Sequence, residues 1–296
     1  MPLDALLLVL AAALLHALWN MAAKHAGGDH RFAFVASVFI AVVWAPVAWW
    51  LGADELPRWG AVQWAAVAAS AAVHVVYFLT LLRGYREADL SVVYPVARGS
   101  GPLVTAGAAI LLLGEPASLL TVAGVAAVCG GVFLIAGGPG LWRGQHGPAA
   151  QPCRQARLHA GLRWGALTGL LIASYSVLDG YAVKVLLMGP VAFDYFGNVL
   201  RIPLQLPLVW RDAAGLRHAL RTQWRCALVV ATLGPLAYML VLYAVTLAPL
   251  SHVAPAREVS MLLAALMGGR LLGEQDRGSR LLGAACIAAG VVALAL

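Results

Sequence analysis

The chain has 296 residues, 62% of them hydrophobic and 11% charged, with a net charge of +7 and a mean hydropathy of +0.83. Soluble domains are about 45–50% apolar and about 25% charged, so this composition excludes an ordinary water-soluble domain. In a soluble protein the positive charge would suggest nucleic acid; in a membrane protein it belongs to the connections between helices, and we expect no nucleic-acid partner.

Ten apolar runs follow one another along the chain. A membrane-spanning helix needs about 20 residues, because about 30 Å of hydrocarbon is crossed at about 1.5 Å per residue. The runs lack the polar–apolar alternation of a membrane β-barrel, and the first lacks the basic leader and cleavage site of a signal peptide. We therefore predict an all-α polytopic membrane protein with ten transmembrane helices at 4–24, 31–51, 60–83, 90–113, 117–136, 162–185, 190–210, 224–247, 250–272 and 279–296.

Cysteines and short motifs give no sign of a metal, a cofactor or catalysis. Cys129, Cys153, Cys226 and Cys286 stand singly, without the spacing of a metal site. The sequence contains neither HExxH nor GxSxG, which argues against a membrane-embedded enzyme. It also lacks GxxxxGK[ST], so direct use of ATP is not expected.

Arginines are unevenly distributed among the connections. If all ten runs span the membrane, the connections after the first, third, fifth, seventh and ninth helices hold nearly all of them. The opposite side offers Arg58, with Lys184 at the border. The positive-inside rule makes the arginine-rich side cytoplasmic, which places both termini outside.

The sequence contains an internal repeat. The segment LSVVYPVARGSGPLVTAGAAILLLGE, from Leu90, resembles LSHVAPAREVSMLLAALMGGRLLGE, from Leu250. The two prolines, Pro95 and Pro255, are 160 residues apart. One residue is lost after the second proline, so Arg257 corresponds to Arg98 at a shift of 159 and Gly273–Glu274 to Gly114–Glu115.

The similarity extends upstream, where HALWNMAAK (16–24) aligns with SVLDGYAVK (176–184). We predict a first five-helix repeat at 1–136, a Gly/Pro/Arg-rich linker at 137–161 and a second five-helix repeat at 162–296. Because five is odd, the second repeat must enter the membrane from the opposite face. Inverted repeats of this kind are typical of secondary transporters.

These features resemble the EamA family of the drug/metabolite transporter superfamily. The resemblance lies in the two five-helix halves, the H-A-x-W-N-x-x-x-K pattern of the first helix, and P…R…LLGE in the fourth and ninth helices. It implies a permease that moves a small metabolite through a cavity lined by helices 1, 3, 4, 6, 8 and 9, with helices 5 and 10 peripheral. It also implies cytoplasmic termini, against the arginine count, and both orientations stay open.

Polar residues inside the apolar runs are the candidates for a substrate site. A charged residue at the centre of a lone helix costs about 2.5–3.5 kcal/mol, so such residues are expected to face a partner or water. In the first helix three of them recur at helical spacing on one face. The candidate substrate-binding residues are His16, Trp19, Asn20, His74, Tyr77, Tyr94, Pro95, Arg98, Tyr175, Asp179, Lys184, Asn198, Arg201, Tyr238, Pro255, Arg257 and Glu258.

Several candidates have a structural alternative. Lys24 and Lys184 lie near helix ends and can reach the membrane surface by snorkelling. The two histidines can be neutral and hydrogen-bonded to a neighbouring helix, which we favour over proton transfer, and Trp19 can serve packing alone. Gly114–Glu115 and Gly273–Glu274 are expected to be structural, with a glycine ending one helix and a carboxylate near the N-terminus of the next.

The charged residues that lie deepest in the apolar runs are the strongest candidates for a functional role. For Arg98, Arg201, Asp179 and Glu258 we favour a functional role over a structural arginine–carboxylate pair. Pro95 and Pro255 each remove a backbone donor and are expected to kink their helices, which is tolerated in lipid beside protein or a water-filled cavity. Two kinked helices, one from each repeat, would then meet around one substrate site.

Arg98, Lys184, Arg201 and Arg257 outnumber Asp179 and Glu258 among the deep charges. This surplus favours a substrate with a carboxylate, such as an amino acid or organic acid. Multidrug efflux of cationic compounds is the alternative substrate class. Coupling to protons through Glu258 or Asp179 and facilitated exchange are both compatible with these residues.

A receptor would carry a sizeable soluble domain, and a purely structural protein would not need deep charges in several helices. We therefore expect a secondary transporter that exports small organic metabolites by alternating access. Its partners are the small-molecule substrate and the lipid bilayer. Its location is a bacterial-type inner (plasma) membrane, and monomer and homodimer both stay open.

Overall fold

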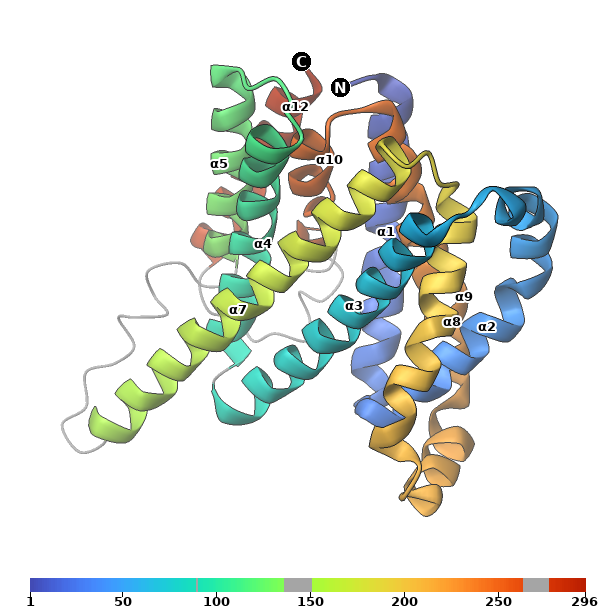
Figure 1. Ribbon diagram of the computed structural model, residues 1–296. Helices are drawn as coiled ribbons and strands as arrows, with labels where there is room; N and C mark the ends of the chain where they lie inside the picture. The colour runs from blue at the N-terminus through green and yellow to red at the C-terminus, as the bar shows by residue number, and fades with distance from the viewer. Residues whose placement is uncertain (89, 136–150, 263–276) are drawn as a thin grey trace. The chain divides into compact units, whose positions relative to one another are not determined.

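A computed structural model describes residues 1–88, 90–135, 151–262 and 277–296. Every regular element within these ranges is a helix (Figure 1), which confirms the predicted all-α polytopic class. The helices are α1 (Leu3–Ala26), α2 (His30–Gly52), the 3₁₀ helix η1 (Ala53–Arg58), α3 (Ala61–Glu87), α4 (Leu90–Leu112), α5 (Leu119–Ile135), α7 (Gln151–Lys184), α8 (Pro190–Val209), α9 (Ala213–Leu247), α10 (Leu250–Ala256) and α12 (Arg277–Ala295).

Five of these helices, α1, α2, α3, α7 and α9, are long and apolar enough to cross a bilayer by length and composition, and α5 and α12 are shorter apolar helices. Helix α8 follows the seventh predicted run but carries Asp194, Asn198, Arg201 and Gln205, which lower its hydropathy. Helix α7 begins at Gln151, inside the expected linker, while 136–150 lie outside the described residues.

The helices gather into two compact units, and each unit draws on both repeats. Unit 1 comprises Met1–Leu3, Val76–Val177 and Ala248–Leu296; unit 2 comprises Asp4–Val75 and Leu178–Leu247. Unit 1 therefore contains α4, α5, α10 and α12, and unit 2 contains α1, α2, α8 and α9. Helices α3 and α7 are each divided between the two units, at residues 75/76 and 177/178.

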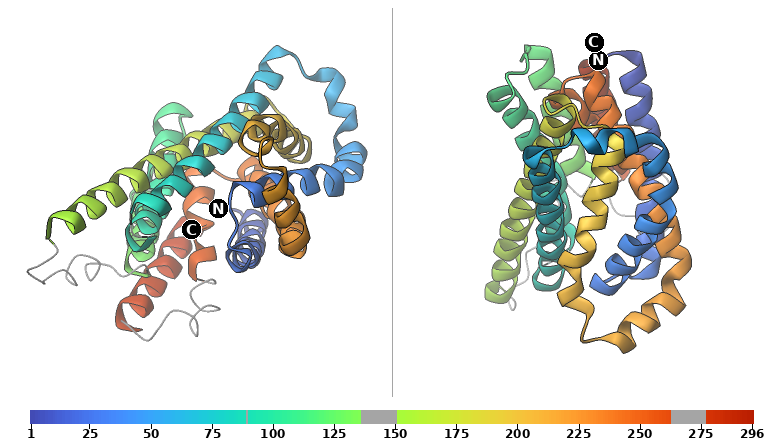
Figure 2. Two further views of the ribbon diagram at one scale, coloured as in Figure 1. Left: turned by 90° about the horizontal axis from the view of Figure 1, so that it is seen from below. Right: turned by 45° about the vertical axis from the view of Figure 1, so that its right-hand side comes forward.

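In unit 1 the helices that correspond in the two repeats pack on each other: α5 lies against α12 and α4 against α10 (Figure 2). Glycines permit the close approach of α5 and α12. A Cβ atom added to Gly131 would lie 2.6 Å from the carbonyl oxygen of Gly283. One added to Gly124 would lie 3.0 Å from the carbonyl oxygen of Gly290. The crossing therefore depends on positions that hold no side chain.

In unit 2, helix α2 lies against α8 and α9 (Figure 1). Phe32 and Val35 of α2 form a buried apolar cluster with Ala227 of α9. The indole of Trp44 donates a hydrogen bond to the carbonyl oxygen of Ala231 at 2.9 Å. Tertiary contacts thus join the second helix of one repeat to the second and third helices of the other.

The connections of unit 2 meet in pairs at the two ends of α2. Arg31, at the start of α2, forms an ion pair with Asp212 between α8 and α9. Beyond the other end of α2, Glu55 accepts a hydrogen bond from the backbone N–H of Gly189, between α7 and α8, at 2.7 Å. The connections after the first and seventh predicted spans therefore share one end, and those after the second and sixth share the other, as alternating spans require.

The prolines behave differently in the two repeats. Helix α10 ends at Ala256, one residue after Pro255, whereas α4 continues through position 95 to Leu112. After α10 the backbone turns more tightly, and the N–H of Glu258 donates to the carbonyl oxygen of Pro255 at 2.9 Å. A kink was expected at each proline. In the second repeat the helix is interrupted just after Pro255, where that repeat has one residue fewer than the first, and in the first repeat the helix continues past Pro95.

Candidate functional site

A buried cluster of charges in unit 1 joins the two repeats. Arg98 of α4 lies with its Nη2 atom 3.0 Å from Oε2 of Glu258, which follows α10. The repeat-equivalent arginine, Arg257, lies farther away, with Nε 3.8 Å from Oε1 of the same carboxylate. One carboxylate is therefore shared by two guanidinium groups that occupy matching positions in the sequence.

The cluster is almost closed to the surface. The exposed fraction of the side chain is 1% for Glu258, 15% for Arg98 and 12% for Arg257. A charge in such a place is strongly penalised unless it is paired. The tight turn after Pro255 puts Glu258 in position, because it ends α10 one residue before Arg257.

Two serines that sequence reasoning missed complete the cluster. Arg98 donates from Nη2 to Oγ of Ser260 at 3.2 Å, and Arg257 donates from Nη2 to Oγ of Ser176 at 3.5 Å. A single serine in an apolar helix does not by itself indicate a functional site. The repeat offered one signal, because Ser176 occupies the position that corresponds to His16 in the first helix.

Three predicted tyrosines also belong to unit 1. Tyr77 of α3 and Tyr175 of α7 pack edge to face, with ring centroids 5.6 Å apart. Tyr94 lies on α4, one turn before Arg98, and is partly exposed. Buried Pro255 lies beside Ala256 at the end of α10. The side chain of Pro95, like those of Lys24 and Ser91, lies outside what the structure describes.

Unit 2 holds a second group of predicted residues. The hydroxyl of Tyr238 on α9 donates a hydrogen bond to the buried carboxylate of Asp179 on α7. The ring of His74 on α3 stands edge-on to Tyr238, with centroids 5.9 Å apart, and its Nδ1 atom lies 2.9 Å from the carbonyl oxygen of Ser70. This contact of His74 lies within its own helix, whereas the expected hydrogen bond was to a neighbouring helix.

Two predicted residues of α8, Asn198 and Arg201, form a chain of hydrogen bonds with Asp194 of the same helix. Arg201 donates from Nη1 to Oδ1 of Asn198 at 3.0 Å, and Asn198 donates from Nδ2 to the carbonyl oxygen of Asp194 at 2.8 Å. Asp194 and Asn198 are buried. Asp194 therefore adds a buried acid to unit 2 that the predicted charge surplus did not include.

On α1, the rings of His16 and Trp19 meet edge to face at 4.8 Å. Asn20 donates from Nδ2 to the carbonyl oxygen of His16 at 2.7 Å, which is a bond within the same helix. The indole N–H of Trp19 is buried and has no hydrogen-bond partner among the described residues. Lys184 lies half-buried in the last turn of α7.

Glu115 has a different structural role from the expected one. Gly114 has φ +67° and follows the end of α4, as a helix-ending glycine should. The carboxylate of Glu115 then accepts hydrogen bonds from the backbone N–H groups of Leu250 at 2.7 Å and Ser251 at 2.8 Å. It therefore caps α10 of the other repeat and not the next helix, α5. Gly273–Glu274 lie outside the described residues.

Within the parts of the chain that the structure describes, no group of three or more His, Cys, Asp or Glu residues could hold a metal ion. In unit 1 the buried guanidinium of Arg98 is neutralised by the carboxylate of Glu258.

The fold and these buried charges define a polytopic α-helical membrane protein built from two inverted five-helix repeats. The chain belongs to the EamA-like transporter family, whose model matches residues 3–137 and 159–296. This confirms the predicted membership of the drug/metabolite transporter superfamily, and the chain is a multi-pass membrane transporter.

Comparison with solved structures agrees with this assignment. Among 27 matching chains is a crystal structure described only as "Crystal structure of protein", which is 17% identical with a TM-score of 0.70. The match covers 99% of this chain and 96% of that one, and at this identity it shows the fold alone. No curated protein matches the chain significantly.

Proposed function

We propose that this transporter exports small organic metabolites that bear a carboxylate, such as amino acids or organic acids, across a bacterial-type inner membrane by alternating access. The observation that carries the substrate class is the ion pair between Arg98 and Glu258 at 3.0 Å. Export is the direction suggested by the resemblance to drug/metabolite transporters, and alternating access is the mode that an inverted repeat favours.

The argument rests on what a buried guanidinium requires. Arg98 needs a negative partner because its side chain is mostly buried in a membrane protein. A substrate carboxylate presents two oxygens, as Glu258 does, and the fork of a guanidinium can bind both of them. Substrate and Glu258 then compete for one arginine, and Ser260 offers a hydroxyl beside it.

The same pair offers a route for coupling to protons. Protonation of Glu258 removes the charge that neutralises Arg98, and the arginine then becomes available to a substrate anion. Arg98 and Arg257 are the charged groups that contact this carboxylate. Asp179, held by the hydroxyl of Tyr238, is the second candidate to carry a proton.

The first experiment is a thermal-shift screen of the purified full-length protein against amino acids, organic acids and the corresponding amides. Labelled hits are then followed in proteoliposomes of both orientations, which also reports the direction of transport. Arg98→Gln should lower the affinity for an acid at least about tenfold and leave its amide unchanged, since one charge-assisted bond is worth about 1.5–3 kcal/mol. Glu258→Gln should keep binding and flatten the pH dependence of transport.

Arg163→Gln, on an exposed part of α7, is the matched control and should transport at the parent rate. Equal losses of affinity for acid and amide in the Arg98 variant would show that the arginine is architectural. Hits confined to lipophilic cations would favour the multidrug alternative instead.

A further inference from the structure

Helix α9 is much longer than a membrane span. Its 35 residues extend about 52 Å at about 1.5 Å per residue, whereas the hydrocarbon core is about 30 Å thick. The apolar run predicted from the sequence covers only 224–247. Because this apolar run alone is long enough to cross the hydrocarbon, we infer that residues 213–223 lie beyond it, and we call residues 213–225 the α9 entry segment.

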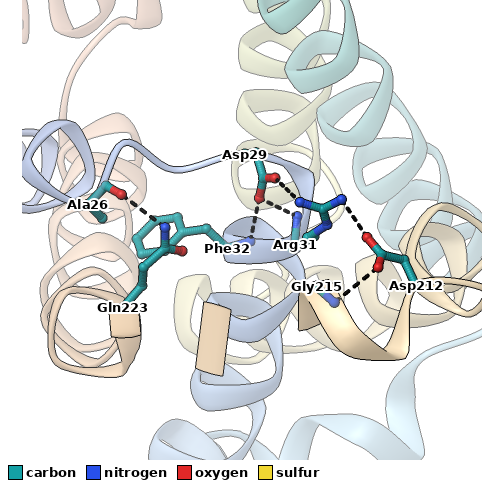
Figure 3. A network of polar contacts seen from close by, with 7 residues as sticks. All are labelled: Ala26, Asp29, Arg31, Phe32, Asp212, Gly215 and Gln223. Atoms are coloured by element: carbon teal, nitrogen blue, oxygen red, sulfur yellow. Dashed lines mark hydrogen bonds and ion pairs between the residues drawn. The ribbon is translucent and has the colours of Figure 1, made fainter. Parts of the chain in front are cut away.

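Polar contacts attach the entry segment to the connection between α1 and α2 (Figure 3). Asp212, just before α9, pairs with Nη2 of Arg31 at 2.5 Å and accepts a hydrogen bond from the backbone N–H of Gly215 at 3.0 Å. This N–H and the Arg31 guanidinium hold the pKa of Asp212 below its usual range. Three turns later, Gln223 donates from Nε2 to the carbonyl oxygen of Ala26 at 3.0 Å.

This attachment fixes which face of the helix points outward. Leu216 and Cys226 pack on the cluster that Phe32 and Val35 form with Ala227. At about 100° per residue, the basic residues fall within an arc of about 100° on the other side of the helix. All four members of this basic stripe are exposed: Arg217, His218, Arg221 and Arg225.

The stripe borders a shallow, open hollow at the surface. Its volume is ≈ 270 Å³, and the residues that line it, Ala214, Arg217, His218 and Arg221, all lie on this one face of α9. The lining holds two arginines and no acidic residue, so its charge is complementary to an anion.

Two exposed tryptophans lie close to the stripe in the sequence. Trp210 precedes the α9 entry segment, and Trp224 lies near its end. Arg211 lies over the ring of Trp210 at 5.4 Å and Arg225 over that of Trp224 at 5.5 Å. Tryptophan is enriched at the membrane–water interface, and the apolar remainder of α9 begins after Arg225.

We propose that the basic stripe of the α9 entry segment binds the phosphate headgroup of an anionic phospholipid in the adjoining leaflet. The stripe belongs to the same helix as a membrane span, so lipid headgroups are its immediate neighbours. Basic residues beside a span attract anionic lipid at about 1 kcal/mol each, and the forked guanidinium matches a phosphate. This inference does not depend on the identity of the transported substrate.

The test compares two triple variants of the full-length protein with equal loss of charge. The first is Arg217→Gln with Arg221→Gln and Arg225→Gln. The control is Arg58→Gln with Arg86→Gln and Arg163→Gln, which are exposed residues on η1, α3 and α7. Purified protein in neutral detergent is titrated with phosphatidylglycerol, with phosphatidylcholine of the same acyl chains, and with inorganic phosphate, while bound lipid is counted by native mass spectrometry.

The parent should prefer phosphatidylglycerol, and the stripe variant should lose on the order of 100-fold in affinity, at about fivefold per arginine. The control should stay within a few-fold of the parent, as should a variant with lysine at the same three stripe positions, which retains the charge. An equal loss in the control would overturn the proposal. Equal binding of phosphatidylcholine would also overturn it. So would binding of inorganic phosphate to the parent protein at the same concentration as phosphatidylglycerol.

Discussion

At the scale of single residues, the two repeat-equivalent arginines hold different positions around one carboxylate. Arg98 lies 3.0 Å from Glu258 and Arg257 lies 3.8 Å from it. Coulomb energy falls with distance, so the carboxylate of Glu258 interacts more strongly with Arg98 than with Arg257. Symmetry in the sequence therefore does not make the two residues equivalent in energy.

We expect Arg98→Gln to destabilise the protein more than Arg257→Gln. Removing one partner of a buried pair leaves the other charge uncompensated, which costs about 3–5 kcal/mol. The double variant Arg98→Gln with Glu258→Gln should regain part of that loss, because it removes both charges of the closer pair. Thermal unfolding in detergent measures all three variants. Equal losses for the two single variants would contradict the distances.

At the scale of elements, contacts between the repeats determine where helices begin and how closely they pack. Glu115, after α4, caps α10 of the other repeat through the N–H groups of Leu250 and Ser251. Helix α5 approaches α12 so closely that the Cβ atom of an alanine at position 131 would lie 2.6 Å from a carbonyl oxygen of α12. Real Cβ contacts are essentially never that short.

Neighbouring glycines of α5 provide a matched test of this packing. Gly131→Ala should destabilise the protein by about 1–3 kcal/mol, the usual cost of overpacking. Gly130→Ala should be neutral or stabilising by up to about 1 kcal/mol, because an alanine Cβ there would meet no atom within 4 Å and alanine favours helix. Thermal unfolding in detergent measures the stability of both variants relative to the parent protein. An unchanged Gly131→Ala variant would mean that α5 and α12 can separate without loss.

At the scale of the whole molecule, the contacts between connections agree with alternating spans. Trp164, at the start of the second repeat, donates from Nε1 to Glu87 at the end of α3 at 2.8 Å, as expected of the connections after the third and fifth spans. Residue Met1, before α1, donates from its backbone nitrogen to the carbonyl oxygen of Ala295 in α12 at 2.8 Å. These contacts pair the connections but assign neither side to the cytoplasm.

The positive-inside rule assigns the sides and can be tested with reporter fusions. A reporter placed after Gly147 should indicate the cytoplasm, and one placed at Asp54 in η1 should indicate the opposite side, because nearly all loop arginines lie on the Gly147 side. Green fluorescent protein and alkaline phosphatase at both positions give complementary signals. Phosphatase activity after Gly147 would reverse the orientation and favour the cytoplasmic termini implied by the family resemblance.

The sequence by itself determined the class of this protein, because hydrophobic length and internal repetition are properties that can be read locally. Ten apolar runs, the inverted repeat and the deep position of Arg98 and Glu258 all followed from spacing and composition. Only the tertiary structure decided the partners. It paired Arg98 with Glu258, gave the arginines Ser260 and Ser176, and showed that Glu115 caps α10 and not α5. The contacts of Arg98 and Glu115 join residues of different repeats, whereas Ser176 and Arg257 both belong to the second repeat. The approach of helices from different repeats is set by glycine contacts and buried-charge compensation, which no local pattern encodes.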